Sequence, residues 1–226
     1  MPEILEKIIP NVMKRLPVLG QAVLETFIMT VWSGAISFVL GLFLGIVLTV
    51  TKKGAVLENR AVFQVLDKTV NLFRSIPFII LLTGVMPLSR LIMGTAIGVR
   101  GAIVPLVFGT VPFFARQIES ALAEVDGGLV EAALSMGLSP VDIIFRVYLR
   151  ESVGPIVRGT TITTISLIGL TAMAGAVGAG GLGNYAIMYG HDRNQVDVTW
   201  VTIIVLVLAV SLIQHIGTAI IKKNTH

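Results

Sequence analysis

The chain contains no cysteine. This absence excludes disulfide bonds, thiolate metal ligands and catalysis by a thiol. The three histidines, His191, His215 and His226, are far apart in the sequence, so we predict no metal site. No grouping of serine, histidine and aspartate suggests a hydrolase either. We therefore expect a protein that is not an enzyme and that holds no cofactor.

Charged residues are also scarce. They make up 13% of the 226 residues, whereas soluble domains carry about 25%. Hydrophobic residues make up 54%, and the mean hydropathy is +0.89. These values predict an all-α membrane protein in a lipid bilayer. The net charge of +4 is spread along the chain, which favours membrane topology over nucleic-acid binding as its explanation.

The phosphate-binding pattern Gly-x-x-x-x-Gly-Lys-Ser/Thr does not occur, so another polypeptide must bind ATP if ATP is used. Residues 178–183, here called the glycine loop, do match Gly-x-Gly-x-x-Gly. That pattern binds dinucleotides only between a strand and a helix, and here it follows an apolar membrane segment. We interpret it as a bend that allows close approach of the backbone.

Apolar stretches of about 20 residues predict five membrane spans within a membrane domain of residues 21–221. An interfacial helix of residues 1–20 precedes them, and a tail of residues 222–226 follows. Pro77 predicts a kink in the second span, because a proline in a membrane helix frees a backbone carbonyl that neighbouring groups must then satisfy. Arg116 and Glu119 are spaced to form an ion pair. The predicted spans cover residues 21–50, 75–86 with a polar lead-in at 55–74, 101–121, 155–176 and 198–221.

The distribution of lysine and arginine gives the orientation. With the N-terminus outside, eleven basic residues face the cytoplasm and six face outward, so the C-terminus is predicted to be cytoplasmic. The inner set is Lys52, Lys53, Arg60, Lys68, Arg74, Arg116, Arg146, Arg150, Arg158, Lys222 and Lys223. The outer set is Lys7, Lys14, Arg15, Arg90, Arg100 and Arg193. Charge is nearly absent from the centres of the spans, which speaks against a proton-coupled carrier.

One long amphipathic stretch, residues 126–151, lies on the predicted cytoplasmic side. A short helix over 129–136 is expected to end at Gly137, which reaches left-handed φ without a steric clash. Ser139 and Pro140 then suit the N-cap and first position of a second helix, and Asp142 suits its first turn. The second helix is predicted to carry one apolar face of Val141, Ile144, Phe145, Tyr148 and Leu149.

Within this stretch the spacing of Glu131, Ala132, Ala133, Gly137, Val147 and Leu149 resembles the coupling loop of ABC-importer permeases, and we therefore call residues 126–151 the coupling loop. The resemblance implies that the two helices, with Ser139 and Pro140 between them, dock on an ATP-binding subunit and transmit its movement. The family pattern has proline after that leucine, where this chain has Arg150. The shape of the exit from the loop is therefore left open.

Further blocks at residues 71–78 (NLFRSIPF), 103–106 (IVPL), 112–119 (PFFARQIE) and 172–183 (AMAGAVGAGGLG) resemble the permease of the methionine ABC importer. The resemblance implies a type I importer fold in a bacterial inner membrane. It also implies a homodimer of this chain, two ATP-binding subunits and a methionine-binding lipoprotein. Met173 matches the position at which that family narrows its pathway.

We therefore expect the permease subunit of an ATP-driven importer of L- and D-methionine. An importer of another amino acid or of a small osmolyte is the alternative within this class. A carrier or channel that works without an ATPase is the alternative outside it, and a membrane enzyme is a more distant one.

Overall fold

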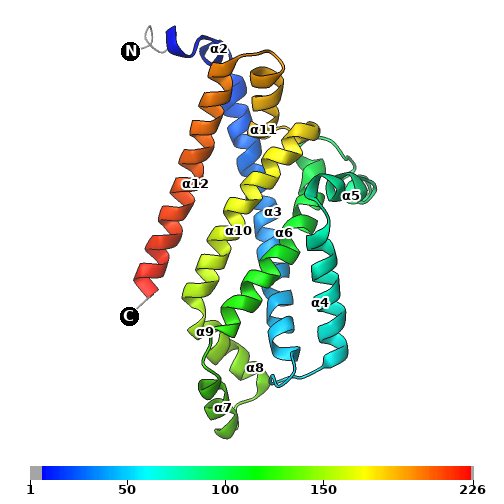
Figure 1. The fold of residues 1–226 in the computed structure, drawn as a ribbon, viewed down its shortest axis with the longest axis vertical. Coiled ribbons are helices and arrows are strands. Elements are labelled where there is room, and N and C mark those ends of the chain that lie inside the picture. Colours follow the sequence, from blue (N-terminus) through cyan, green and yellow to red (C-terminus); the bar gives the residue numbers. More distant parts are fainter. Residues whose placement is uncertain (1–6, 225–226) are drawn as a thin grey trace. The chain divides into compact units, whose positions relative to one another are not determined.

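The computed structural model describes residues 7–224, which are helical with short connections and contain no strand (Figure 1). Four helices of this part are long and apolar enough to cross a membrane, and a fifth span results if one broken pair is counted. The four are α3 (Leu16–Thr51), α6 (Gly98–Ala123), α10 (Val153–Ala174) with the turn after it, and α12 (Val196–Asn224). The predicted all-α membrane class is confirmed, and the five predicted spans are obtained when the broken pair is counted as one span.

The broken pair consists of α4 (Arg60–Ser75) and α5 (Phe78–Met93). Asn59 caps α4, because its Oδ1 accepts a hydrogen bond from the Val62 N–H at 3.1 Å. Ile76 is extended, with φ −82° and ψ 122°, because the ring of Pro77 disfavours a helical conformation at the residue before it. The predicted kink at Pro77 is therefore a complete interruption of the helix.

The described chain divides into two compact units. The first contains residues 7–34, 77–107 and 164–213, and the second contains residues 35–76, 108–163 and 214–224. Each of the four long helices α3, α6, α10 and α12 contributes residues to both units.

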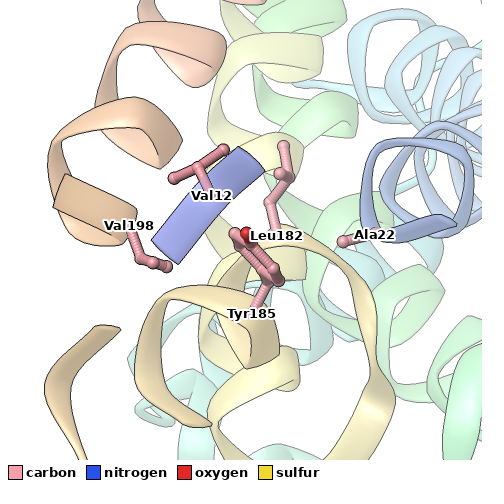
Figure 2. Packing of buried hydrophobic residues seen from close by; sticks show 5 residues of the cluster. All are labelled: Val12, Ala22, Leu182, Tyr185 and Val198. Carbon is pink, nitrogen blue, oxygen red and sulfur yellow. The ribbon is translucent and has the colours of Figure 1, made fainter. Parts of the chain in front are cut away.

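The core of the first unit forms around Tyr185, which is 1% exposed. Figure 2 shows the buried side chains that converge there. Asn11 fixes the short helix α2 (Pro10–Met13), since its backbone and side-chain N–H groups both donate to Asp197, at 2.9 and 3.0 Å. Arg15 donates to Gln195 at 2.6 Å. The five residues in the figure are Val12, Ala22, Leu182, Tyr185 and Val198.

The predicted interfacial helix of residues 1–20 is only partly matched by the structure. Residues 1–6 lie outside the described part, and residues 7–20 do not form one helix, because α3 already begins at Leu16. Pro17 is its second residue, where the missing N–H is not needed. The location of this segment at the membrane surface stays a prediction. At the other end α12 extends to Asn224, and residues 225–226 of the predicted tail are not described.

The segment after the glycine loop differs from the prediction. The polar sequence of residues 185–197 predicts a loop, but the chain forms α11 (Gly181–Tyr185) and the π-helical turn η3 (Ala186–His191). Only residues 192–195 lie outside helices, and Asn194 turns the chain there with φ 56°. Sequence polarity was misleading because Tyr185 is a core residue and Tyr189 packs beside it.

The second unit is held by close packing of α3 on α6. The sequence spacing of Gly41 and Gly45 is a small-xxx-small pair, which predicts a helix-packing face, and the structure confirms that both glycines lie against α6. A Cβ atom on Gly45 would lie 2.5 Å from the Cβ of Ile118, and one on Gly41 would lie 2.7 Å from Cδ1 of Phe114. Phe114 and Ile118 belong to the buried core of this unit together with Leu122.

Replacement of Gly45 by alanine is expected to destabilise the protein. The added methyl group meets Ile118 and the Ala115 carbonyl oxygen, and overpacking of this kind costs about 1–3 kcal/mol. Gly20→Ala is the matched control in the same helix, because a Cβ there meets nothing within 4 Å. Thermal unfolding in detergent should give a lower midpoint for Gly45→Ala and an unchanged or higher midpoint for Gly20→Ala. Equal midpoints would contradict the packing.

Candidate functional site: the coupling loop and the end of α10

The coupling loop folds as a helical hairpin in which both short helices are capped by local contacts (Figure 1). The helix α7 (Gly127–Ser135) begins after Asp126, whose Oδ1 accepts from the Gly128 N–H at 2.8 Å. It ends at Ser135 with Met136 as its C-cap, and the following Gly137 has the predicted left-handed conformation, with φ +79°. The Gly137 N–H donates to the Leu134 carbonyl and the Leu138 N–H to the Ala133 carbonyl, at 2.9 and 3.1 Å. These two bonds are the Schellman pattern of a glycine-terminated helix.

The second helix starts at once. The helix α8 (Pro140–Ile143) is capped by Ser139, whose Oγ accepts from the Asp142 N–H at 3.2 Å and donates to Oδ2 of Asp142 at 2.6 Å. Arg146 forms an exposed ion pair with the same carboxylate at 3.1 Å. The predicted cap, the proline at the first position and the acid in the first turn are all confirmed. The turn between the helices is therefore defined by its own hydrogen bonds.

A π-helical turn, η1 (Ile144–Tyr148), follows α8, and α9 (Leu149–Glu151) follows it. The wider turn changes which side chains share a face. The prediction of one apolar face from Val141 to Leu149 is therefore wrong. Val141 and Phe145 point outward, at 60% and 64% exposure, whereas Tyr148 and Leu149 pack against the core of Phe114, Ile118 and Leu122. Burial also raises the pKa of the Tyr148 hydroxyl above its ordinary value.

The hairpin thus has an inner anchor and an outer apolar surface. Ile143 and Ala133 are buried, at 0% and 3% exposure. Several other large apolar side chains of the hairpin are exposed. A group of exposed apolar side chains on one short hairpin is typical of an interaction surface. At the exit, α9 ends at Ser152, whose Oγ donates to the Ala121 carbonyl of α6 at 3.1 Å. The exposed residues are Leu129, Leu134, Met136, Val141 and Phe145, which we call the apolar patch.

The predicted coupling residues fall into three groups. Glu131 and Ala132 are exposed on α7, next to the buried Ala133. The turn between the helices contains Gly137, Ser139 and Pro140. Val147 and Leu149 are half-buried, so Leu149 anchors the hairpin within the unit. The outward Phe145 was not among the predicted coupling residues, because the π-turn that exposes it leaves no clear signal in the sequence.

Met173 lies elsewhere, on the last turn of α10, and is 42% exposed. The helix ends in the π-helical turn η2 (Gly175–Ala179), where Gly178 has φ +94°. The glycine loop then returns against α10. A Cβ on Gly183 would collide with the Ala172 carbonyl oxygen, and one on Gly175 would lie 2.6 Å from the Asn184 nitrogen. The interpretation of this loop as a bend with close backbone approach is confirmed.

Two residues of α3 that the sequence analysis did not select hold the same loop. Glu25 accepts from the Gly181 N–H at 2.7 Å, and Thr26 accepts from the Leu182 N–H at 2.8 Å. The sequence did contain a signal, because Glu25 is a carboxylate in a segment predicted to span the membrane. This single carboxylate lies near the start of the predicted span of residues 21–50, whereas the absence of charge was argued for the centres of the spans.

A polar cluster in the second unit connects α4 with α6. The predicted ion pair of Arg116 with Glu119 is present at 2.5 Å, and Arg116 also pairs with Asp67 at 2.5 Å. Asn71 accepts a further hydrogen bond from Arg116 at 3.0 Å. Two polar residues of α4, Asp67 and Asn71, are therefore paired with Arg116 of α6. No group of three metal-ligating side chains occurs among residues 7–224.

Three comparisons relate this chain to known proteins. The model of the family described as "Binding-protein-dependent transport system inner membrane component" matches residues 37–225. A Vibrio cholerae protein described as a probable D-methionine transport system permease protein, MetI, is 46% identical over 202 residues, which cover 89% of this chain and 90% of the relative. A Pasteurella multocida protein of the same description is 45% identical, with 92% and 95% of the two chains covered.

Solved structures agree with the sequence relatives. An inward-facing structure of the MetNI methionine ABC transporter superimposes with a TM-score of 0.92 at 43% identity, covering 94% of this chain and 99% of the other. An amino acid ABC transporter superimposes with a TM-score of 0.78 at 16% identity, covering 95% and 98%. The second match shows the fold alone. Together these structures confirm the type I importer fold.

Replacement of Gly137 by alanine is expected to loosen the hairpin. A Cβ there meets nothing within 4 Å, so the cost comes from its φ of +79° alone and is about 1–2 kcal/mol. Gly127→Ala is the matched control, because that glycine has equal space and no positive φ. Hydrogen exchange over residues 127–138 should be roughly tenfold faster in Gly137→Ala. Similar exchange in both variants would contradict this account of the turn.

Proposed function

This chain belongs to the family of binding-protein-dependent transport system inner membrane components, and we propose that it forms the membrane pathway of an ATP-driven methionine importer. The cargo is proposed as L- and D-methionine, because the relatives are described as D-methionine permeases and the matching structure is a methionine transporter. Hydrolysis of ATP is assigned to a separate subunit. The proposed assembly contains two copies of this chain, two ATP-binding subunits and a methionine-binding lipoprotein.

The observation that carries this proposal is the apolar patch on a hairpin whose backbone is capped at each turn. Exposed apolar side chains grouped in this way mark a surface at which a protein interacts with a partner. A groove on the ATP-binding subunit is the proposed cover. Phe145 and Met136, at 64% and 72% exposure, are the side chains best placed to enter such a groove.

The same hairpin has a path for transmitting movement. Ile143 is fully buried. Tyr148 and Leu149 pack on three residues in the C-terminal half of α6: Phe114, Ile118 and Leu122. Ser152 adds a hydrogen bond to the Ala121 carbonyl. A displacement of the apolar patch would therefore be passed to α6 and to the start of α10 rather than absorbed in a flexible loop.

The orientation and the gate are parts of the same proposal. The N-terminus is placed outside and the C-terminus in the cytoplasm, because the predicted inner segments hold eleven of the 17 basic residues. This puts the coupling loop on the side where ATP is available. Met173 is proposed to narrow the pathway, since its side chain is half-exposed beside the break in α10 and its thioether adapts to small spaces.

Replacement of Phe145 by serine tests the docking surface. We expect weaker assembly with the ATP-binding subunit, by about 2 kcal/mol or roughly 30-fold, because an aromatic anchor is lost from an interface. Leu91→Ser is the control, since Leu91 is 83% exposed and lies on α5, on the opposite predicted side. Copurification with the ATPase measures the effect. Equal assembly of both variants would argue against the patch as the docking site.

Uptake into vesicles tests the cargo. Vesicles that contain this chain, its ATPase and a methionine-binding protein should accumulate labelled L-methionine only when ATP is on the ATPase side. Unlabelled D-methionine should compete, whereas other amino acids and osmolytes should not. Hydrolysis of ATP without accumulation would reject methionine and keep the importer class. Uptake without an ATPase would reject the class itself.

A further inference from the structure

Glu25 and Thr26 offer two adjacent acceptors to two consecutive backbone N–H groups. The Gly181 N–H donates to Oε2 of Glu25 at 2.7 Å, and the Leu182 N–H donates to Oγ of Thr26 at 2.8 Å. Both side chains are oriented from within α3. Gln21 donates to Oε1 of Glu25 at 2.8 Å, and the Thr26 hydroxyl donates to the Ala22 carbonyl at 3.0 Å. We call these two residues the α3 clamp.

The loop that the clamp holds is adapted to lie directly on it. Gly180 and Gly181 have φ of +85° and +73°, in the region that favours glycine. A Cβ on Gly180 would lie 2.5 Å from Oε2 of Glu25, and one on Gly181 would lie 2.7 Å from Oγ of Thr26. The clamp therefore requires both glycines, for conformation and for space.

The held loop in turn contacts the residues on either side of Met173. Asn184 donates from Nδ2 to the Gly175 carbonyl at 3.3 Å, and its backbone approaches Gly175 closely enough to exclude a side chain there. Gly183 lies against the carbonyl of Ala172. The segment that contains Met173 is thus fixed through α11, and the first two N–H groups of α11 are fixed by the clamp.

We propose that Glu25 and Thr26 are positioning residues, which set where Met173 stands in the pathway by holding the glycine loop on α3. This inference rests on the proposed gate role of Met173. The clamp acts on backbone N–H groups, so it fixes the end of α10 without depending on a side chain of the loop. The hydrogen bonds to the Glu25 carboxylate are charge-assisted, and Glu25 is therefore the stronger half of the clamp.

The absence of cysteine provides the test. A Met173→Cys chain carries a single thiol, whose rate of modification by a small polar maleimide reports the exposure of residue 173. The rate is measured in the complex with the ATPase, with and without ATP, beside ATP-driven uptake of methionine. Glu25→Ala, Glu25→Gln and Thr26→Val are combined with this reporter. Thr30→Val is the matched control, because the Thr30 hydroxyl donates to a carbonyl of its own helix, that of Thr26.

We expect Glu25→Ala to change the modification rate about tenfold, which corresponds to ~1.4 kcal/mol, and to lower uptake more than ATP hydrolysis. Glu25→Gln keeps an acceptor without charge and should recover part of the difference, and Thr26→Val should have a smaller effect. Thr30→Val should have the same modification rate and the same uptake as the reporter chain without a further substitution. Assembly with the ATPase should be equal throughout, because the clamp is remote from the coupling loop in sequence.

Unchanged modification rates in both Glu25→Ala and Thr26→Val would overturn the inference. So would an effect of Thr30→Val as large as that of Thr26→Val, because a general loosening of α3 would then explain both. Failure of the proposed cargo is separate. In that case the unsubstituted chain, which keeps Met173, would itself show no methionine uptake, while the modification rates of the reporter chains would still report on the clamp.

Discussion

The need to satisfy every backbone hydrogen-bonding group governs this structure. In an apolar span, an N–H or carbonyl without a partner costs several kcal/mol, so a helix can be interrupted only where side chains or other backbone groups replace the lost bonds. The interruption after Gly178 shows how this is met. Glu25 and Thr26 accept from the first free N–H groups of α11, and Asn184 donates to the Gly175 carbonyl. A polar pair in α3 thereby allows a bend beside the proposed gate.

The coupling loop meets the same requirement by different means. It lies outside the apolar spans, and its caps come from its own residues: Asp126, Gly137 and Ser139. Because these hydrogen bonds are made within the hairpin, its apolar side chains are not needed to hold the turns. Some of them pack against the rest of the unit, and others form the exposed surface. Ile143 and Leu149 face the unit, and Phe145 faces outward. A hairpin that is already ordered can transmit force as soon as its partner binds. A disordered loop would first have to fold on the partner.

Local signals were sufficient for much of this fold. Gly137, Ser139 and Pro140 act on their immediate neighbours, so their spacing predicted both caps correctly. Gly41 and Gly45 predicted a packing face for a similar reason, although their partners on α6 could not be named. What failed depends on distant contacts. The π-turn at 144–148 and the helix at 181–185 are stabilised by the core around Phe114 and by Glu25, which lie far away in the sequence. A pattern with a period of 3.6 residues contains no information about either.

The glycines separate into two classes, and the difference bears on the proposed mechanism. Gly41 and Gly45 have helical φ and are required because α6 occupies the space of a side chain, so they hold two helices together. Gly137 has open space and is required for its φ alone, so it shapes a turn. Gly180 and Gly181 meet both conditions. A residue constrained both in conformation and in contact cannot move by itself, and the glycine loop must therefore either stay on the α3 clamp or leave it as a unit. That behaviour is what the gate proposed at Met173 requires if it has two positions.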